Sequence, residues 1–252
     1  MEPLAVILLF AAGLAGGIVN AIAGGASLIT FPAMLAAGLP PVVANASNAL
    51  AVTPGHLAAA VADREALPRD TGTLTEWVLA GLIGGAVGAV ILLVTPERLF
   101  MVLVPPLIGG ATAIFAFGPA IRQRLAAGRG AAPAGPRRAL IFAICTYGGY
   151  FGAGLGVMLM AAIALVRHGD QPRTANALKN LCGSAVSVAG VGIFIWQGLI
   201  AWPPTVVMLA GSVIGGIAGG RLLPFLPAPV VRAAVILAGV VLTLAAIRSY
   251  WF

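Results

Sequence analysis

The sequence predicts an all-α polytopic membrane protein made of two homologous halves, each with about five helical segments. Three observations support this: an apolar composition, a series of apolar runs, and a match of the chain to itself. Of the 252 residues, 60% are hydrophobic and only 8% are charged, whereas soluble domains average about 25% charged residues. The 34 glycines and 18 prolines fit the same class, because both residues are frequent in membrane helices.

Apolar runs bounded by charged residues, proline or glycine follow one another along the chain. They cover residues 3–23, 24–38, 41–62, 73–94 and 98–118, and then 139–156, 157–166, 174–196, 204–224 and 229–249. The second run of each set is too short to cross a hydrocarbon core of about 30 Å at 1.5 Å per residue. We therefore expect broken or re-entrant helices at segments two and seven, which membranes tolerate only where protein or a cavity covers the freed backbone.

A shift of 131 residues aligns the two halves without a gap. Residues coincide in this register at Gly17 with Gly148, Gly25 with Gly156, Gly38 with Gly169, Pro41 with Pro172, and Asn45 with Asn176. Matches of glycine, proline and asparagine in one register indicate an internal duplication. We predict a first transmembrane repeat over 1–118, a cytoplasmic arginine-rich linker over 119–138 and a second transmembrane repeat over 139–252.

The arginines predict the orientation. With ten crossings and the N-terminus outside, eleven of the thirteen arginines fall in inner loops and only Arg98 and Arg248 stay outside, as the positive-inside rule requires. An odd number of segments in each half makes the repeat inverted, as in many secondary transporters. The loops 63–72 and 118–138 are then cytoplasmic, and the loop 197–203 is outside. This distribution also explains the net charge of +7 without a nucleic-acid partner.

Two amide clusters lie inside apolar runs, at equivalent places in the two halves. The sole lysine, Lys179, lies in the second cluster and aligns with Asn48 of the first. A charge placed inside the membrane usually faces a cavity and marks a substrate path, although a lysine near a helix end can also snorkel. The asparagines could instead bond neighbouring helices. We predict one polar pocket that combines Lys179 with Asn45, Asn48, Asn176 and Asn180.

Glycine-rich stretches lie where segment one meets segment two and where segment six meets segment seven. A helix broken there exposes backbone N–H groups and the positive end of the following half-helix, which favours an anion. Packing of small residues is the alternative, and it explains the stretches 81–88 and 211–220. The predicted substrate-binding residues at the breaks are Gly24, Gly25, Gly154 and Gly156, with the polar groups of Asn20 and Ser27.

The remaining titratable residues give weaker indications. His56 is a candidate proton carrier, with a hydrogen-bonded structural histidine as the alternative, and Asp63 and Glu76 are expected at the membrane interface. Cys145 and Cys182 lie in apolar runs and form no metal-binding pattern. There is no HExxH or GxSxG motif and no paired aspartates, so we predict no enzyme activity, no cofactor and no metal site.

The sequence resembles the sulfite exporter TauE/SafE family of membrane transporters. The first half carries the stretch "GGIVNAIAGGASLITFPAMLAAGLPPVVANASN", and the second carries "GGYFGAGLGVMLMAAIALVRHGDQPRTANALKN". The chain departs from the pattern at Leu155 and Val157, where a denser glycine run is common. The resemblance implies transport of sulfite, sulfonates, thiosulfate or related sulfur or carboxylate anions across the bacterial cytoplasmic membrane.

We therefore predict a multi-pass secondary transporter of a small anion that works by alternating access. Lys179 would supply the charge, and the asparagines would donate hydrogen bonds to the oxyanion. A passive anion channel and a membrane-embedded enzyme subunit are the alternatives. The sequence leaves open the coupling ion, proton or sodium, and the formation of a homodimer.

Overall fold

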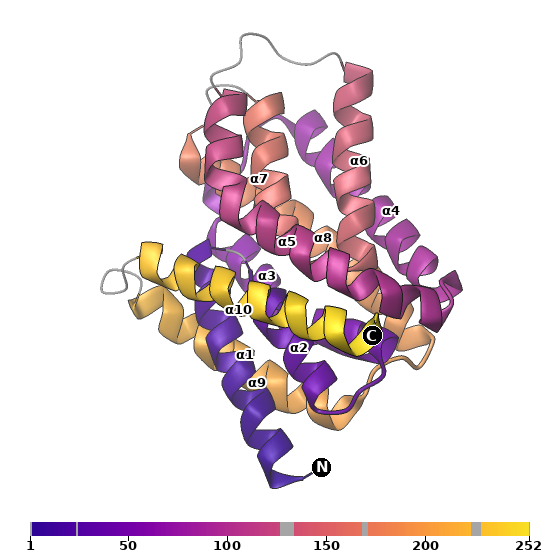
Figure 1. The fold of residues 1–252 in the computed structure, drawn as a ribbon. Coiled ribbons are helices and arrows are strands. Elements are labelled where there is room, and N and C mark those ends of the chain that lie inside the picture. The colour runs from indigo at the N-terminus through magenta and orange to yellow at the C-terminus, as the bar shows by residue number, and fades with distance from the viewer. Residues whose placement is uncertain (1, 24, 127–133, 168–170, 223–227, 252) are drawn as a thin grey trace.

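The structure is a computed structural model that describes the chain except for residues 1, 24, 127–133, 168–170, 223–227 and 252. Its described part is entirely helical (Figure 1), so the predicted all-α polytopic class is confirmed. The helices are α1 (Pro3–Ala23), α2 (Ser27–Ala36), α3 (Pro41–Ala62), the 3₁₀ helix η1 (Arg64–Ala66), α4 (Thr71–Val94), α5 (Glu97–Ala126), α6 (Ala134–Tyr150), α7 (Leu155–Val166), α8 (Pro172–Trp196), α9 (Trp202–Leu222) and α10 (Ala228–Tyr250).

Local sequence signals explain several helix ends. Pro41 and Pro172 occupy the first turns of α3 and α8, where the missing N–H and the fixed φ of proline cost nothing. Asp70 caps α4, since its side chain accepts hydrogen bonds from the N–H groups of Gly72 and Thr73. Gly38, with φ of 86°, follows α2 and lets the chain leave the helix.

Six helices of the described part are long and apolar enough to cross a membrane. They contain the spans Pro3–Asn20, Thr71–Val94, Glu97–Ile121, Pro172–Trp196, Trp202–Gly219 and Arg232–Tyr250. By contrast, α2 has 10 residues and α7 has 12, so their lengths are only about 15 and 18 Å. The short helices expected at segments two and seven are therefore present, and neither reaches across a bilayer by itself.

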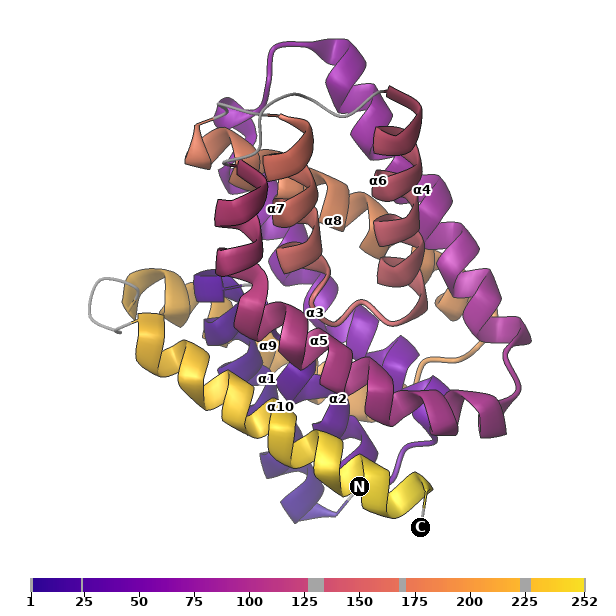
Figure 2. The same cartoon turned by 45° about the horizontal axis from the view of Figure 1, so that its top comes forward.

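The helices α6 and α7 form a hairpin, and the start of α6 and the end of α7 both lie beside the start of α4. Arg137 in the first turns of α6 contacts Glu76 of α4, and Arg167 after α7 donates to Thr73 of α4. The turn between α6 and α7, at 151–154, points into the molecule (Figure 2). In Figure 1, α2 likewise turns back beside α1 toward the end at which α1 begins. Each half thus contributes a helical hairpin whose second helix starts in the interior.

Close glycine contacts pack one half against the other. Helix α1 lies on α9, where a Cβ atom on Gly17 would collide with the carbonyl oxygen of Ser212. Helix α4 lies on α6 in the same way, where a Cβ atom on Gly88 would collide with the carbonyl oxygen of Thr146. Backbones can approach so closely only where side chains are small. The small-residue packing expected for 81–88 and 211–220 is therefore observed. In the register of 131 residues, α4 corresponds to α9 and α1 corresponds to α6, so the two contacts are equivalent. The inverted orientation of the halves stays a prediction.

Helix α5 runs further than expected, to Ala126, and α6 begins at Ala134. Both helices thus enter the interval 119–138, which was assigned to the linker. Proline at 119 has no N–H to bond the carbonyl four residues earlier, and Arg232 of α10 supplies the missing donor. Its Nη2 donates to the Phe115 carbonyl oxygen at 3.1 Å and also to that of Ala116. This contact keeps the backbone satisfied and lets the helix continue.

Candidate functional site

A cavity of about 580 Å³ lies where the two hairpin turns meet the central helices α3 and α8. Its walls come from the end of α1, the starts of α2 and α7, the second half of α3, the first half of α8, and α9. The predicted residues that line it are Asn20, Gly25, Ser27, His56, Gly154, Gly156, Asn176, Lys179 and Asn180. Predicted residue Gly24 lies outside the described residues, and Asn45 and Asn48 line a different cavity.

Two short helices begin at the cavity wall. Helix α2 starts at Ser27 and α7 at Leu155, and both residues line the cavity. Gly152 and Gly154 turn the chain into α7 with φ of 78° and 77°, a conformation that favours glycine. The start of a helix carries the positive end of the helix dipole and N–H groups without helical partners; here those of Leu28, Ile29, Leu155 and Val157 donate to carbonyls of their own turns. Two such ends, one from each half, therefore face the same space.

Asp63, which directly follows α3, also lines the cavity. Its Oδ2 accepts hydrogen bonds from the side-chain amides of Asn176, at 2.7 Å, and Asn180, at 2.8 Å. The sequence interpretation had placed Asp63 at the membrane interface and left both amides free for substrate, and it missed this contact. The sequence carries no signal for this contact, because Asp63 follows the last residue of α3 and meets α8 only through the packing of the two helices.

Lys179 lies between the two amides on the same face of α8 and is partly exposed to the cavity. It is close enough to Asp63 and to His56 for their charges to act on one another. Among the described residues, these three are the titratable side chains that line the cavity. A single ammonium, two amides and a carboxylate thus form one polar cluster in a wall that also carries Asn20, Ser27, His56 and Ser212.

Asn45 and Asn48 lie on a second, much smaller cavity of about 40 Å³. The amide of Asn45 donates to the Tyr150 carbonyl oxygen at 2.9 Å. Asn48 donates to Ser27 Oγ at 3.2 Å and accepts from the Thr30 hydroxyl. The structure thus places the four asparagines on two cavities, and the first pair bonds neighbouring helices; the role of Asn45 and Asn48 as substrate ligands stays a prediction.

The geometry of α3 and α8 explains this separation. The two helices are antiparallel, since Asp63 at the end of α3 contacts the first half of α8, whereas Ser47 near the start of α3 accepts from the N–H of Ala201, beyond the end of α8. Equivalent positions near the starts of two antiparallel helices lie at opposite ends of the pair. Four residues line both cavities and form the layer between them: Ser27, His56, Gly152 and Leu155.

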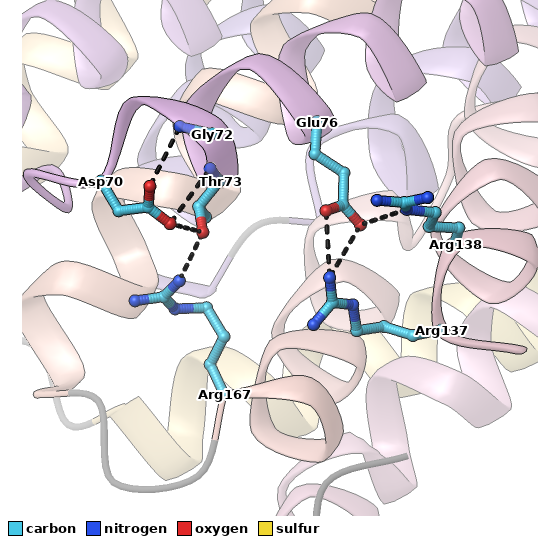
Figure 3. Close-up of polar contacts among 7 residues, drawn as sticks. All are labelled: Asp70, Gly72, Thr73, Glu76, Arg137, Arg138 and Arg167. Carbon is cyan, nitrogen blue, oxygen red and sulfur yellow. Dashed lines mark hydrogen bonds and ion pairs between the residues drawn. The ribbon is translucent and has the colours of Figure 1, made fainter. Parts of the chain in front are cut away.

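A charged cluster joins the start of α4 to the start of α6 and to the end of α7 (Figure 3). Glu76, expected at the interface, pairs with Arg137 at 3.0 Å and with Arg138 at 3.7 Å. Asp70 accepts from the Thr73 hydroxyl at 2.6 Å, and Arg167 donates to that same hydroxyl oxygen at 3.0 Å. The Thr73 hydroxyl, followed by the N–H groups of Gly72 and Thr73, lowers the pKa of Asp70 from its usual value.

Comparison with known proteins assigns the chain to a family. The family model described as "Sulfite exporter TauE/SafE" matches residues 9–246. The chain belongs to this family. A "Probable membrane transporter protein" of Haemophilus influenzae is 28% identical over 229 residues, which cover 85% of this chain and 84% of the relative. The "Probable membrane transporter protein YfcA" of Escherichia coli is 28% identical over 228 residues, covering 88% and 82%. No solved structure matches the chain.

Membership of the family and the six apolar helices of the described part identify a multi-pass protein of the bacterial cytoplasmic membrane. It is a membrane transporter of the TauE/SafE family, and its partners are the lipid bilayer and a small substrate.

Proposed function

We propose that this protein is a secondary transporter of a small, sulfur-containing oxyanion such as sulfite, thiosulfate or a sulfonate, and that it binds this anion in the cavity of about 580 Å³. The family description supports a sulfur oxyanion. The volume lies in the range of small-molecule sites, about 300–1,000 Å³, and leaves room for the anion with part of its hydration.

The observation that carries the proposal is the convergence of positive and donor groups on one wall. Lys179 supplies a full charge, and the amides of Asn176 and Asn180 supply neutral donors on either side of it. An ammonium inside a membrane protein is costly unless it has a partner; Asp63 provides one in the empty cavity, and a transported anion would provide another. Lysine contributes a compact charge with three donors, which suits an anion that binds and then leaves.

The backbone contributes the second part of the proposed site. Gly25 lies in the turn before α2, Ser27 is the first residue of α2, and Gly154 and Gly156 lie at the start of α7. Helix starts bind anions through their N–H groups and dipole. The anion would therefore lie between the two half-helix ends, with Asn20 as a further polar group, and each half of the chain would supply one end.

The two cavities support alternating access. The large cavity extends to Ala62 and Asp63 at the end of α3, and the small one lies beyond Ser27 and Leu155. Movement of the hairpin turns would transfer the open space from one side of this layer to the other. His56 lines both cavities and is the proposed carrier of a coupling proton, with sodium as the alternative coupling ion. The homodimer stays a prediction.

A passive channel needs a continuous path, and the layer between the two cavities argues against one in this conformation. Flux into proteoliposomes separates the alternatives. We expect saturable uptake of sulfite, thiosulfate or the sulfonate sulfoacetate that responds to an imposed proton or sodium gradient, with weaker uptake of sulfate. Unsaturable flux that ignores both gradients would establish a channel, and the absence of flux for all four anions would refute the proposed substrates.

A further inference from the structure

The two amides that the proposed function gives to the substrate are already occupied by the protein itself. Asp63 directs a single oxygen, Oδ2, at both of them, with donor–acceptor distances of 2.7 and 2.8 Å. These are short for N–H···O bonds, as is usual when the acceptor is charged. The carboxylate also lies within electrostatic reach of Lys179. Asp63 therefore receives the same set of donors that an oxyanion in the cavity would need.

We propose that Asp63 is a resident substitute for the transported anion: it holds the amide pair in the empty cavity and must release it when the anion binds there. This inference rests on the proposed function, because it assumes that Asn176 and Asn180 are anion ligands. The two amide N–H groups donate to one unprotonated oxygen at a time, so an oxyanion would bind there through a terminal oxygen. When Asp63 returns to the amides, it promotes release of the anion.

The position of Asp63 permits this exchange. The residue caps α3, with φ of −92° and ψ of 4°, and the chain then enters the short helix η1. Its side chain is partly exposed, so a displaced carboxylate can be hydrated and does not have to be buried without a partner. Asn180, by contrast, has a relative exposure of only 5%. Asn176 is partly exposed like Asp63, so Asn180 is the donor that burial holds in place and Asp63 is the acceptor that can leave.

A substitute and a structural strut make opposite predictions for anion affinity. If Asp63 only joins α3 to α8, its removal loosens the cavity and weakens binding. If it competes with the anion, removal frees the amides and strengthens binding. A hydrogen bond to a charged group is typically worth enough to change an equilibrium about tenfold or more. We therefore expect Asp63→Asn and Asp63→Ala to bind sulfite and thiosulfate about tenfold more tightly than wild type and to release them more slowly.

The experiment measures dissociation constants of sulfite and thiosulfate by titration calorimetry on the purified full-length protein. Glu65→Gln is the matched control, because Glu65 is exposed two residues away and its removal changes the local charge equally; its affinity should equal that of wild type. Asp63→Asn preserves the shape of the side chain and gives the answer even if Asp63→Ala does not fold. Unchanged or weaker affinity in Asp63→Asn overturns the proposal.

A double-mutant cycle with Asn180→Ala separates competition for the amides from a general gain of positive charge. If Asp63 occupies the amides, Asn180→Ala should cost little affinity in wild type and about tenfold in the Asp63→Asn background. Equal costs in both backgrounds overturn the substitute role. Binding in wild type without a gain in Asp63→Asn refutes this inference alone, whereas the absence of binding in both proteins also refutes the proposed function.

Discussion

The two asparagine clusters occupy equivalent positions in the duplicated sequence, yet their side chains bond different partners. Asn45 and Asn48 are almost fully buried and bond the carbonyl of Tyr150 and the hydroxyl groups of α2. Asn176 and Asn180 line the large cavity and bond the carboxylate of Asp63, which we propose an anion displaces. Repetition of a motif therefore preserves where the amides lie along a helix, and the groups opposite them decide which partners they bond.

The largest effect is expected at Lys179, the position where the second cluster departs from the first. Lys179→Gln keeps polarity and much of the length but removes the charge, so anion affinity should fall about tenfold to a hundredfold. Lys179→Arg should also reduce transport, because the larger, planar guanidinium group of arginine does not replace a compact ammonium group. Uptake of sulfite and thiosulfate measures both changes, with Arg173→Gln on the exposed start of α8 as the control. A snorkelling lysine would tolerate arginine and would give near-normal flux with glutamine.

A matched pair of substitutions tests the comparison itself. Asn45→Ala removes the bond to the Tyr150 carbonyl and should lower the stability of the folded protein by about 1–2 kcal/mol, with anion affinity changed less than about twofold. Asn176→Ala should instead cost little anion affinity in wild type and about tenfold in the Asp63→Asn background, with a smaller loss of stability, because Asn176 and Asp63 are both partly exposed. Thermal unfolding with and without thiosulfate reports both quantities. If Asn45→Ala abolished binding without loss of stability, the clusters would share one site after all.

The helices were largely predictable because apolar runs and proline breaks mark them. The run 41–62 coincides with α3, and 73–94 differs from α4 by two residues at the start. The run 139–156 was read as continuous, but Gly152 and Gly154 adopt positive φ and end α6 at Tyr150. The extension of α5 to Ala126 was not expected, because it passes Pro119; the carbonyl that this proline leaves without a helical donor is bonded by Arg232, more than a hundred residues away.

The donor groups of the candidate site were predictable from the sequence, but their acceptor was not. Lys179 and the glycine breaks stand out in an apolar sequence because charge and backbone breaks are costly in a membrane. The partner of Asn176 was hidden, since Asp63 lies at a helix end where carboxylates are common. Only the antiparallel packing of α3 on α8 brings the two together. Local chemistry thus marks the donors, and tertiary structure determines which of them meet an acceptor.

The smallest effect is expected at Asp70, which contrasts with Asp63 because its partners are the fixed groups of a helix start. Its pKa is lowered in the folded protein, first by the Thr73 hydroxyl. Its stabilising contribution is therefore complete above the unfolded pKa of about 4 and disappears as the pH falls through the lower folded value. Asp70→Asn should slightly lower the melting temperature at neutral pH, and the difference should vanish in acid. A difference that persists there would contradict the capping role.

The position of a bound anion tests the central claim most directly. Selenosulfate, an analogue of thiosulfate, can be located by the anomalous scattering of its selenium in a crystal of the full-length protein. We predict a selenium peak in the cavity of about 580 Å³, with an anion oxygen within hydrogen-bond distance of the Asn176 and Asn180 amides, Lys179 alongside, and Asp63 turned away. A peak beside Asn45 and Asn48, or only on the surface of the protein, would contradict the account.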